Sequence, residues 1–231
     1  MARFIVIDGL DGCGKATQTK LLKERLIAEG KNAISVSFPN YTSNSSALVK
    51  MYLNGELGED ISKLNPYMCG AFYAVDRFVQ YTTYLKQYFL RDNNTIILSD
   101  RYLSANIIHQ GSKLTSAEEK HKYIRWCYDF ECGLAGLPKE DITLVLAIPP
   151  LKSQELMTKR YNGDETKKDV HESNVDYLDK CYYELKDTLE YIETQDDIHW
   201  KMVNCLDSVT NSIKSIEEIA EIIYGEVKYL L

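Results

Sequence analysis

The sequence predicts a three-layer α/β fold in which helices flank a five-stranded parallel sheet. Five apolar runs of strand length alternate with longer segments of helical periodicity, and this alternation is typical of parallel sheets. The first run leads through a glycine-rich turn directly into a helix. At 231 residues the chain is long enough for one large domain with a full core. We therefore expect a single domain over residues 1–231.

The first strand and the turn after it carry the most informative motif. An apolar run ends in Gly9-x-x-x-x-Gly14-Lys15, and a helix follows to about Glu29. This is the spacing of a phosphate-binding loop, in which small residues let backbone N–H groups turn toward phosphate oxygens. The helix N-terminus and Lys15 add positive potential. The plainer alternative is a glycine-rich turn with an incidental lysine. The strand before and the helix after favour phosphate binding, with a triphosphate as the ligand.

One residue of this motif departs from the usual pattern. Ala16 follows the lysine, where Ser or Thr normally gives a hydroxyl to Mg²⁺. Thr17 comes next, but it points from a different side of the helix. Because Mg²⁺ keeps several waters, phosphates and water-bridged carboxylates can hold most of its shell. The direct protein ligands of the metal are therefore left open.

Composition indicates an ordinary globular protein and argues against several classes. The chain is 45% hydrophobic and 26% charged, and its net charge of -7 argues against a general nucleic-acid binder. No secretory signal and no membrane-length apolar run is seen, so we expect a cytoplasmic protein without a membrane partner. Free thiols are expected for the six scattered cysteines, which are Cys13, Cys69, Cys127, Cys132, Cys181 and Cys205.

The segments after the loop predict the next elements. Gly30 stands where the first helix should end, a second strand covers 33–38, and a further helix starts near Ser46. The Ser and Asn residues of 42–46 either cap that helix or face a ligand at the end of the strand. After a loop over 54–65, residues 66–91 predict a long helix. Its aromatic stripe is expected to be mostly core, and consists of Phe72, Tyr73, Phe78, Tyr81, Tyr84, Tyr88 and Phe89.

Two pairs of side chains in the middle of the chain are candidates for base recognition. Tyr73 and Arg77 are four residues apart and share a helix face, so they could contact a base or only each other through a cation–π interaction. Asn106 and Gln110 have the same spacing on the helix after the third strand. Their amides could hydrogen-bond the edge of a base or each other.

A carboxylate and a guanidinium stand at the end of the third strand. Residues 94–99 predict the third strand, whose unbroken apolar run at 96–98 suits a strand buried on both faces, and Asp100 and Arg101 follow. The two could simply form an ion pair. In a phosphate-binding fold the carboxylate of a neighbouring strand end usually faces the metal, and an adjacent arginine can bind phosphate.

The last third of the chain completes the fold. We expect helices over 116–132, 150–161, 172–195 and 213–230, and strands over 141–148 and 199–204. The segment 162–172 is highly charged and poor in apolar residues. It is either a solvated loop or a mobile lid that brings Arg160, Lys167 and Lys168 to a phosphate.

Five segments together resemble the thymidylate kinase family, in order and spacing, over essentially the whole chain. They are I-D-G-L-D-G-C-G-K-A-T, F-P-N-Y, F-Y-A-V-D-R, S-D-R-Y-L-S-A-N-I-I-H-Q-G and K-R-Y-N-G-D-E-T-K-K-D-V-H-E. The first is shared with many ATPases, whereas the A-V-D-R and D-R-Y segments are more discriminating. The resemblance implies a P-loop nucleoside monophosphate kinase domain with a lid over about 160–172. It also implies Mg²⁺-dependent transfer of the ATP γ-phosphoryl group to dTMP, giving dTDP and ADP.

The resemblance also implies roles for individual residues. Tyr73 would stack on thymine, Arg77 would address a base carbonyl, and Arg101 would reach the acceptor phosphate. From its place at the end of the third strand, Asp100 would face Mg²⁺ directly or through water. The ATP-binding set is Gly9, Gly12, Cys13, Gly14, Lys15, Ala16 and Thr17. The dTMP-binding set is Asp11, Phe38, Tyr73, Arg77, Arg101, Asn106 and Gln110, and the catalytic set is Lys15, Asp11, Arg101 and Arg160.

Some positions depart from the family pattern. Some members carry a basic residue in the phosphate loop where this chain has Gly12, so the lid would supply the cation, Arg160 first and then Lys167 or Lys168. Asn40 stands where many relatives carry Glu, and no basic residue lies in 41–46. Acceptor phosphate binding would then depend on Arg101 and hydroxyl groups.

Two other functions stay open at this stage. A few pocket residues set base preference, so the chain could phosphorylate another deoxynucleotide or a deoxynucleoside. A nucleotide sensor that has lost its metal hydroxyl at Ala16 would bind ATP without turnover. The family resemblance further implies a homodimer packed through long helices, as is usual among relatives.

Overall fold

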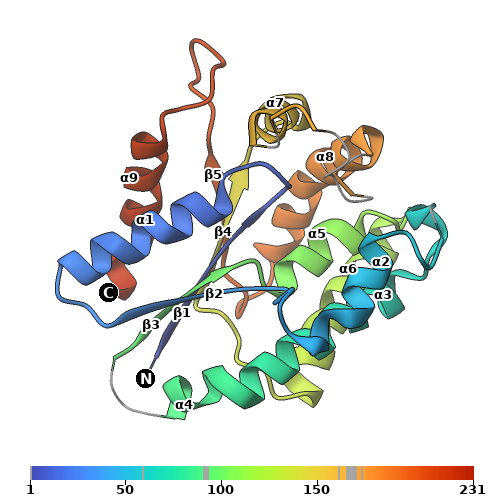
Figure 1. Cartoon of the computed structure of the whole chain (residues 1–231), viewed down its shortest axis with the longest axis horizontal. Helices are drawn as coiled ribbons and strands as arrows, with labels where there is room; N and C mark the ends of the chain where they lie inside the picture. The colour runs from blue at the N-terminus through green and yellow to red at the C-terminus, as the bar shows by residue number, and fades with distance from the viewer. Residues whose placement is uncertain (1, 59, 91–93, 161, 165–170, 173) are drawn as a thin grey trace.

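The computed structural model contains one parallel sheet with the strand order β2-β3-β1-β4-β5 (Figure 1). It describes residues 2–58, 60–90, 94–160, 162–164, 171–172 and 174–231, and leaves out the side chain of Arg160. The strands are β1 (Arg3–Gly9), β2 (Ala33–Ser37), β3 (Ile96–Asp100), β4 (Ile142–Ala147) and β5 (Trp200–Asn204). The α/β fold and the five-stranded parallel sheet expected from the sequence are confirmed.

The register of the central strands brings three loops to one edge of the sheet. Ile7 of β1 and Ser37 of β2 both pair with Asp100 of β3, and Gly9 pairs with Leu146 of β4. The three strands β1, β2 and β3 therefore end at nearly the same level. Because ligands of open α/β sheets bind beyond the carboxyl ends of the strands, the segments that follow these strands form the candidate site.

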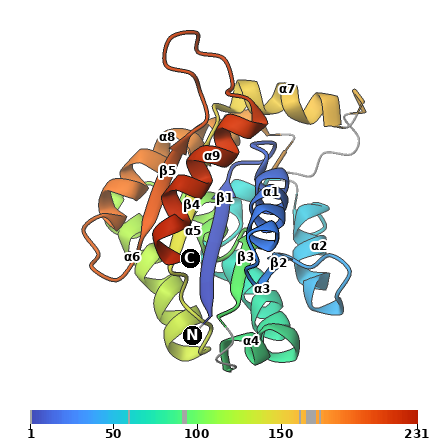
Figure 2. The ribbon, with the colours of Figure 1, turned by 90° about the vertical axis from the view of Figure 1, so that its left-hand side faces the viewer.

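Helices cover both faces of the sheet (Figures 1 and 2). One face carries α1 (Lys15–Ala28) and α9 (Ile216–Val227), whose apolar side chains share one core cluster with inward residues of the sheet. A second cluster lies on the other face. The remaining helices are α2 (Ala47–Leu53), α3 (Pro66–Gln80), α4 (Lys86–Leu90), α5 (Leu103–Gly111), α6 (Ala117–Tyr128), α7 (Pro150–Arg160) and α8 (Val175–Ile192).

Local sequence signals fix several helix ends. The Asn65 side chain accepts a hydrogen bond from the N–H of Tyr67 at 2.9 Å at the start of α3. Ser116 forms a capping box with Glu119 at the start of α6. Gly30, with φ +77°, follows the end of α1 in the left-handed region. These ends lie within a few residues of those that the sequence predicted.

The aromatic helix differs from its prediction in one respect. It continues through a π-helical turn, Tyr81–Leu85, into α4, and two of its seven aromatic residues are exposed while the other five pack against the core. Phe78 and Tyr84 are 44% and 46% exposed, and the other five are half-buried against the core. The reason is geometric, since at about 100° per residue these positions spread over more than half of the helix circumference.

Two smaller predictions can also be checked. All six cysteines are free thiols, as expected. Of the helices in the described ranges, none combines the length and the apolar character of a membrane span.

Candidate active site

The loop between β1 and α1 has the backbone of an anion-binding turn. Gly9, Gly12 and Gly14 have φ of +139°, +78° and +90°, a region that favours glycine. Helix α1 begins at Lys15, and no described side chain caps its first N–H groups. These N–H groups and the positive end of the helix dipole are therefore available to an anion.

The ammonium group of Lys15 is bound by the loop itself. Its Nζ donates to the carbonyl oxygens of Gly9 at 3.0 Å and Leu10 at 2.8 Å, and the residue is only 6% exposed. A phosphate oxygen is a stronger partner for an ammonium group than a neutral carbonyl. The lysine is thus held beside the position where the loop would receive a phosphate.

A buried carboxylate ties the loop to the sheet and to α5. Asp8 is fully buried, accepts the N–H of Gly9 at 2.8 Å, and is bound by the hydroxyl of Ser104 at 2.5 Å. Burial raises the pKa of Asp8, while Lys15 and Ser104 oppose that shift. Asp8 therefore anchors the first residue of the loop.

Helix α7 packs directly against the loop at Gly12. A Cβ on this residue would lie 2.6 Å from Cγ of Met157 and 2.7 Å from the carbonyl oxygen of Ser153. Met157 is fully buried at this contact. A side chain at position 12 would require α7 to move.

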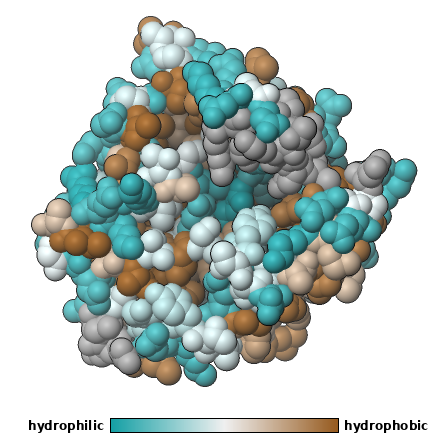
Figure 3. Space-filling view, viewed as in Figure 1, coloured by the Kyte–Doolittle hydropathy of each residue, from teal (hydrophilic) through white to brown (hydrophobic). Residues whose placement is uncertain are grey.

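The phosphate loop borders the larger of two neighbouring cavities, with a volume of about 1070 Å³. Asp100 at the end of β3 and the segment Ile213–Ile219 before and within α9 contribute to its wall. This last segment was not among the predicted site residues, because nothing in its composition indicates a ligand. In the space-filling view, hydrophilic atoms line a hollow near the centre of the molecule (Figure 3).

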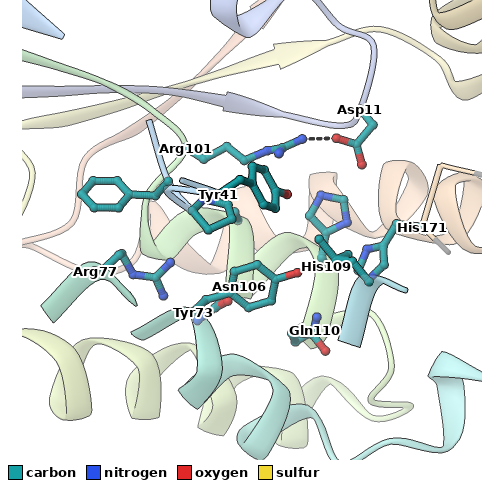
Figure 4. A pocket seen from close by; sticks show the side chains of 13 residues that line it. Asp11, Tyr41, Tyr73, Arg77, Arg101, Asn106, His109, Gln110 and His171 are labelled. Atoms are coloured by element: carbon teal, nitrogen blue, oxygen red, sulfur yellow. Dashed lines mark hydrogen bonds and ion pairs between the residues drawn. The ribbon is translucent and has the colours of Figure 1, made fainter. Parts of the chain in front are cut away.

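The second cavity is a smaller pocket on the α3 and α5 side, with a volume of about 40 Å³. Its wall contains every residue of the predicted dTMP-binding set (Figure 4). These residues are Asp11, Phe38, Tyr73, Arg77, Arg101, Asn106 and Gln110. A volume of this size is on the scale of one or two waters, so side chains must move outward to admit a nucleotide. Tyr41, which is 47% exposed, lines both cavities.

An ion pair between Arg101 and Asp11 lies where the two cavities meet. Both residues line both cavities, and the guanidinium donates from Nη2 to the Asp11 carboxylate. Although burial opposes it, the charge of Arg101 keeps the pKa of Asp11 well below its usual range. Nε of Arg101 has no hydrogen-bond partner among the described residues. The simple alternative, a pair between Arg101 and Asp100, is not what the structure shows.

Arg77 lies at the far end of the pocket and is held by an unpredicted partner. Its Nε and Nη2 each donate to Glu131 at 2.6 Å, and Nη1 donates to the carbonyl oxygen of Tyr102 at 3.3 Å. Arg77 and Glu131 are 2% and 0% exposed. A cation–π contact of Arg77 is made with the ring of Tyr102, at 5.8 Å, rather than with Tyr73.

The two amides of α5 also face this pocket, and each has its own partner. Asn106 donates to the carbonyl oxygen of Gly70 at 3.0 Å, and Gln110 donates to the hydroxyl of Tyr52 at 3.2 Å. The two amides therefore bond to other residues rather than to each other. Within the described residues, Oε1 of Gln110 is buried without a hydrogen-bond partner, so it can accept from a ligand.

Two buried histidines close the remaining side of the pocket. The rings of His109 and His171 lie 5.3 Å apart, and His171 Nε2 contacts the hydroxyl of Tyr52 at 2.7 Å. Burial lowers the pKa of His109 to about 4 and also lowers that of His171. Both rings are thus neutral near pH 7. The sequence did not single out either residue as functional, because a histidine on a helix or in a charged loop is more often structural.

The metal and lid predictions are only partly covered by the structure. Asp100 and Glu172 line the larger cavity with the phosphate loop, and no cluster of three metal-binding side chains occurs in the described ranges. Lys167, Lys168 and the side chain of Arg160 lie outside the described part of the chain. Their predicted roles stay predictions.

Comparison with known proteins identifies the family of this chain. The family described as thymidylate kinase matches residues 7–212. A thymidylate kinase of Rhodopirellula baltica is 29% identical over 187 residues, which cover 81% of this chain and 69% of that protein. One from Mycobacterium tuberculosis is 31% identical over 161 residues, with coverages of 69% and 71%. One from Dictyostelium discoideum is 26% identical over 219 residues, with coverages of 92% and 83%.

Proposed function

This chain belongs to the thymidylate kinase family, and we propose that it transfers the γ-phosphoryl group of ATP to dTMP, giving ADP and dTDP. The observation that best supports this reaction is the Asp11–Arg101 pair at the junction of the two cavities. A phosphoryl group can pass between nucleotides only where their phosphates meet. An arginine with an unused N–H at that junction can bind both.

ATP would occupy the larger cavity. Backbone N–H groups from Gly12 to Thr17 and the N-terminus of α1 would bind its phosphates. Lys15 would exchange the carbonyls of Gly9 and Leu10 for phosphate oxygens. The nucleoside would extend toward Ile213–Ile219, which line the same cavity.

dTMP would occupy the smaller pocket. Tyr73 would stack on the thymine ring, Arg77 would donate to a base carbonyl, and Asn106 and Gln110 would contact the base edge. The unpaired Oε1 of Gln110 can accept a base N–H. Arg101 would then reach the 5′-phosphate at the other end of the pocket.

The residues present fit a hydrated Mg²⁺. Asp100 and Glu172 offer carboxylate oxygens on the wall of the larger cavity, and oxygen is the ligand that Mg²⁺ prefers. With Ala16 in place of a hydroxyl residue, we propose that Asp100 holds the ion through water. When bound, Mg²⁺ neutralises charge on the phosphates of ATP.

The transfer needs positioning and charge neutralisation more than covalent help. An oxygen of the dTMP phosphate attacks the γ-phosphorus, and the bond to the bridging oxygen breaks, so that ADP leaves with the electron pair. A phosphate monoester is mostly a dianion at pH 7, with a second pKa of about 6, so no general base is required. Lys15 and Arg101 would neutralise charge on the transferred group. From the lid we propose Arg160 as a further cation, ahead of Lys167 and Lys168.

An acceptor screen tests the proposed function. Purified protein with ATP and Mg²⁺ is given dTMP, dUMP, dGMP or thymidine, and nucleotide products are separated and quantified. We expect the highest kcat/KM with dTMP. Preference for thymidine would make the protein a nucleoside kinase, and ATP binding without ADP formation for any acceptor would favour a sensor.

We also propose that the protein is a cytoplasmic homodimer. Exposed apolar side chains along α3 and the π-helical turn give it a surface to bury, namely Met68, Val75, Phe78 and Tyr84. Reduced cysteines fit a reducing compartment. Sedimentation at micromolar concentration should give twice the chain mass of 26.5 kDa. A monomer mass would contradict the proposed dimer.

A further inference from the structure

A charged side chain lies buried behind the acceptor pocket, where neither the sequence motifs nor the reaction requires one. Glu131 is 0% exposed and sits in a π-helical turn, Asp129–Leu134, that extends α6. Such turns are rare and frequently occur at functional sites, because the extra residue redirects a side chain. Here the redirected side chain faces Arg77.

The carboxylate of Glu131 contacts both residues proposed to recognise the base. It accepts hydrogen bonds from Nε and Nη2 of Arg77 at 2.6 Å each. Nδ2 of Asn106 lies 3.4 Å from Oε1 of Glu131. One carboxylate thus links α3, α5 and the end of α6. Arg77 and Asn106 lie on the same side of the pocket in Figure 4.

The contacts leave Arg77 able to donate to a ligand. A guanidinium group has five N–H bonds, and the contacts with Glu131 and the Tyr102 carbonyl account for three. Each of Nη1 and Nη2 retains one, and Arg77 lines the pocket. Since two bonds to one carboxylate fix the plane of the guanidinium, Glu131 determines where these remaining N–H groups point.

Stability alone does not explain this pair. Desolvating two charges is unfavourable, and replacing a buried ion pair by apolar residues of similar size is often neutral or stabilising. A side chain that only filled space behind the pocket would be better apolar. Orientation of the base-binding groups is a reason for a charged pair.

We propose that Glu131 is a positioning residue for base recognition, acting through Arg77 and Asn106. It contacts no substrate itself. This inference rests on the proposed function, because it needs a pyrimidine carbonyl at Arg77. It predicts that Glu131 affects which base is accepted, and affects the donor site little.

The test compares Glu131→Gln with a matched control, Glu140→Gln. Glu140 is a second buried carboxylate, 5% exposed and bound by Tyr128, and it lies outside both cavities. In Glu131→Gln the amide presents N–H groups to a guanidinium that needs acceptors. We expect the KM for dTMP to rise about tenfold or more, with kcat changed less than about threefold and the KM for ATP unchanged.

Base selectivity separates the two roles, because a residue with a purely structural role would not change the preference for one base over another. dCMP carries an amino group in place of the 4-carbonyl of thymine, which is the carbonyl that we propose Arg77 addresses, so a correctly oriented Arg77 should reject dCMP. We expect the ratio of kcat/KM for dTMP over dCMP to fall about tenfold in Glu131→Gln and to stay at the wild-type value in Glu140→Gln.

Two outcomes would overturn the inference. One is a ratio of kcat/KM for dTMP over dCMP that stays at the wild-type value in Glu131→Gln, whether or not overall activity falls. If that variant does not fold, the double variant Arg77→Met with Glu131→Met decides, because it removes both charges together. A folded double variant that keeps wild-type selectivity also overturns it. By contrast, wild-type protein that does not phosphorylate dTMP would remove the proposed function itself.

Discussion

At the scale of single residues, Arg101 carries most of the proposed chemistry. It is paired with Asp11 at the junction of the two cavities, and its Nε has no partner among the described residues. A stabilising cation is worth about 10³ to 10⁵ in the rate of phosphoryl transfer. We predict that Arg101→Met lowers kcat with dTMP by about 10³ at saturating substrates.

Two comparisons make that prediction specific. Arg125→Met removes an exposed arginine on α6 and should leave kcat within about twofold of wild type. Steady-state rates and thermal unfolding of both variants, with wild type, separate lost chemistry from lost folding. If folded Arg101→Met lost less than about tenfold in kcat, another cation would stabilise the transferred group instead.

His109 gives a prediction about stability and pH. Its pKa is lowered by burial from an ordinary 6.5 to about 4, so the unfolded chain binds a proton first as pH falls. The free energy of unfolding should therefore decrease as pH falls from 6.5 toward 4, by about 1.4 kcal/mol per unit. At pH 5 this amounts to about 2 kcal/mol from His109.

Urea unfolding at pH 7.5 and pH 5 checks this value. In His109→Gln the decrease between the two conditions should be smaller than in wild type by about 2 kcal/mol. The difference between the two proteins cancels the contributions of other groups, including the buried carboxylates. His199→Gln removes an exposed histidine and should follow wild type. Parallel behaviour of His109→Gln and wild type would contradict the lowered pKa.

At the scale of elements, the contact between Gly12 and α7 couples the phosphate loop to the helix that enters the lid. Alanine at position 12 would meet Met157 and the Ser153 carbonyl at 2.6 and 2.7 Å and would also hold φ at +78°. We predict that Gly12→Ala raises the KM for ATP about tenfold or more, because α7 or the loop must shift.

Gly136→Ala is the matched control for the backbone. Gly136 also has a positive φ, +68°, but a Cβ there meets nothing within 4 Å. It should lose about 1 to 2 kcal/mol of stability and keep its KM for ATP. If Gly12→Ala behaved like Gly136→Ala in both measurements, the packing of α7 on the loop would have no role in ATP binding.

Elements differ in how well the sequence predicts them. Strand and helix limits could be predicted because apolar periodicity and capping residues such as Asn65 and Ser116 mark them. The π-helical turns could not, since each depends on tertiary packing around one extra residue. That is why Glu131 could not be identified from its helix.

At the scale of the whole molecule, the order of strands in the sheet determines which residues lie together at the site. Asp11 and Arg101 are far apart in sequence and line one pocket because β1 lies beside β3. Motif spacing and family resemblance predicted the candidates in that pocket. They did not predict the partners, because the Asp11–Arg101 and Arg77–Glu131 pairs join segments about 90 and 54 residues apart.

The central claim is that one cavity binds the ATP phosphates while the neighbouring pocket binds a thymine nucleotide. A crystal structure with dTMP and a non-hydrolysable ATP analogue tests it most directly. The account predicts the thymine ring beside Tyr73, with a base carbonyl at Arg77 and the 5′-phosphate at Arg101, and analogue phosphates on the loop at Lys15. A thymine ring bound elsewhere, with Arg77 still enclosed and donating nothing to it, would contradict the account.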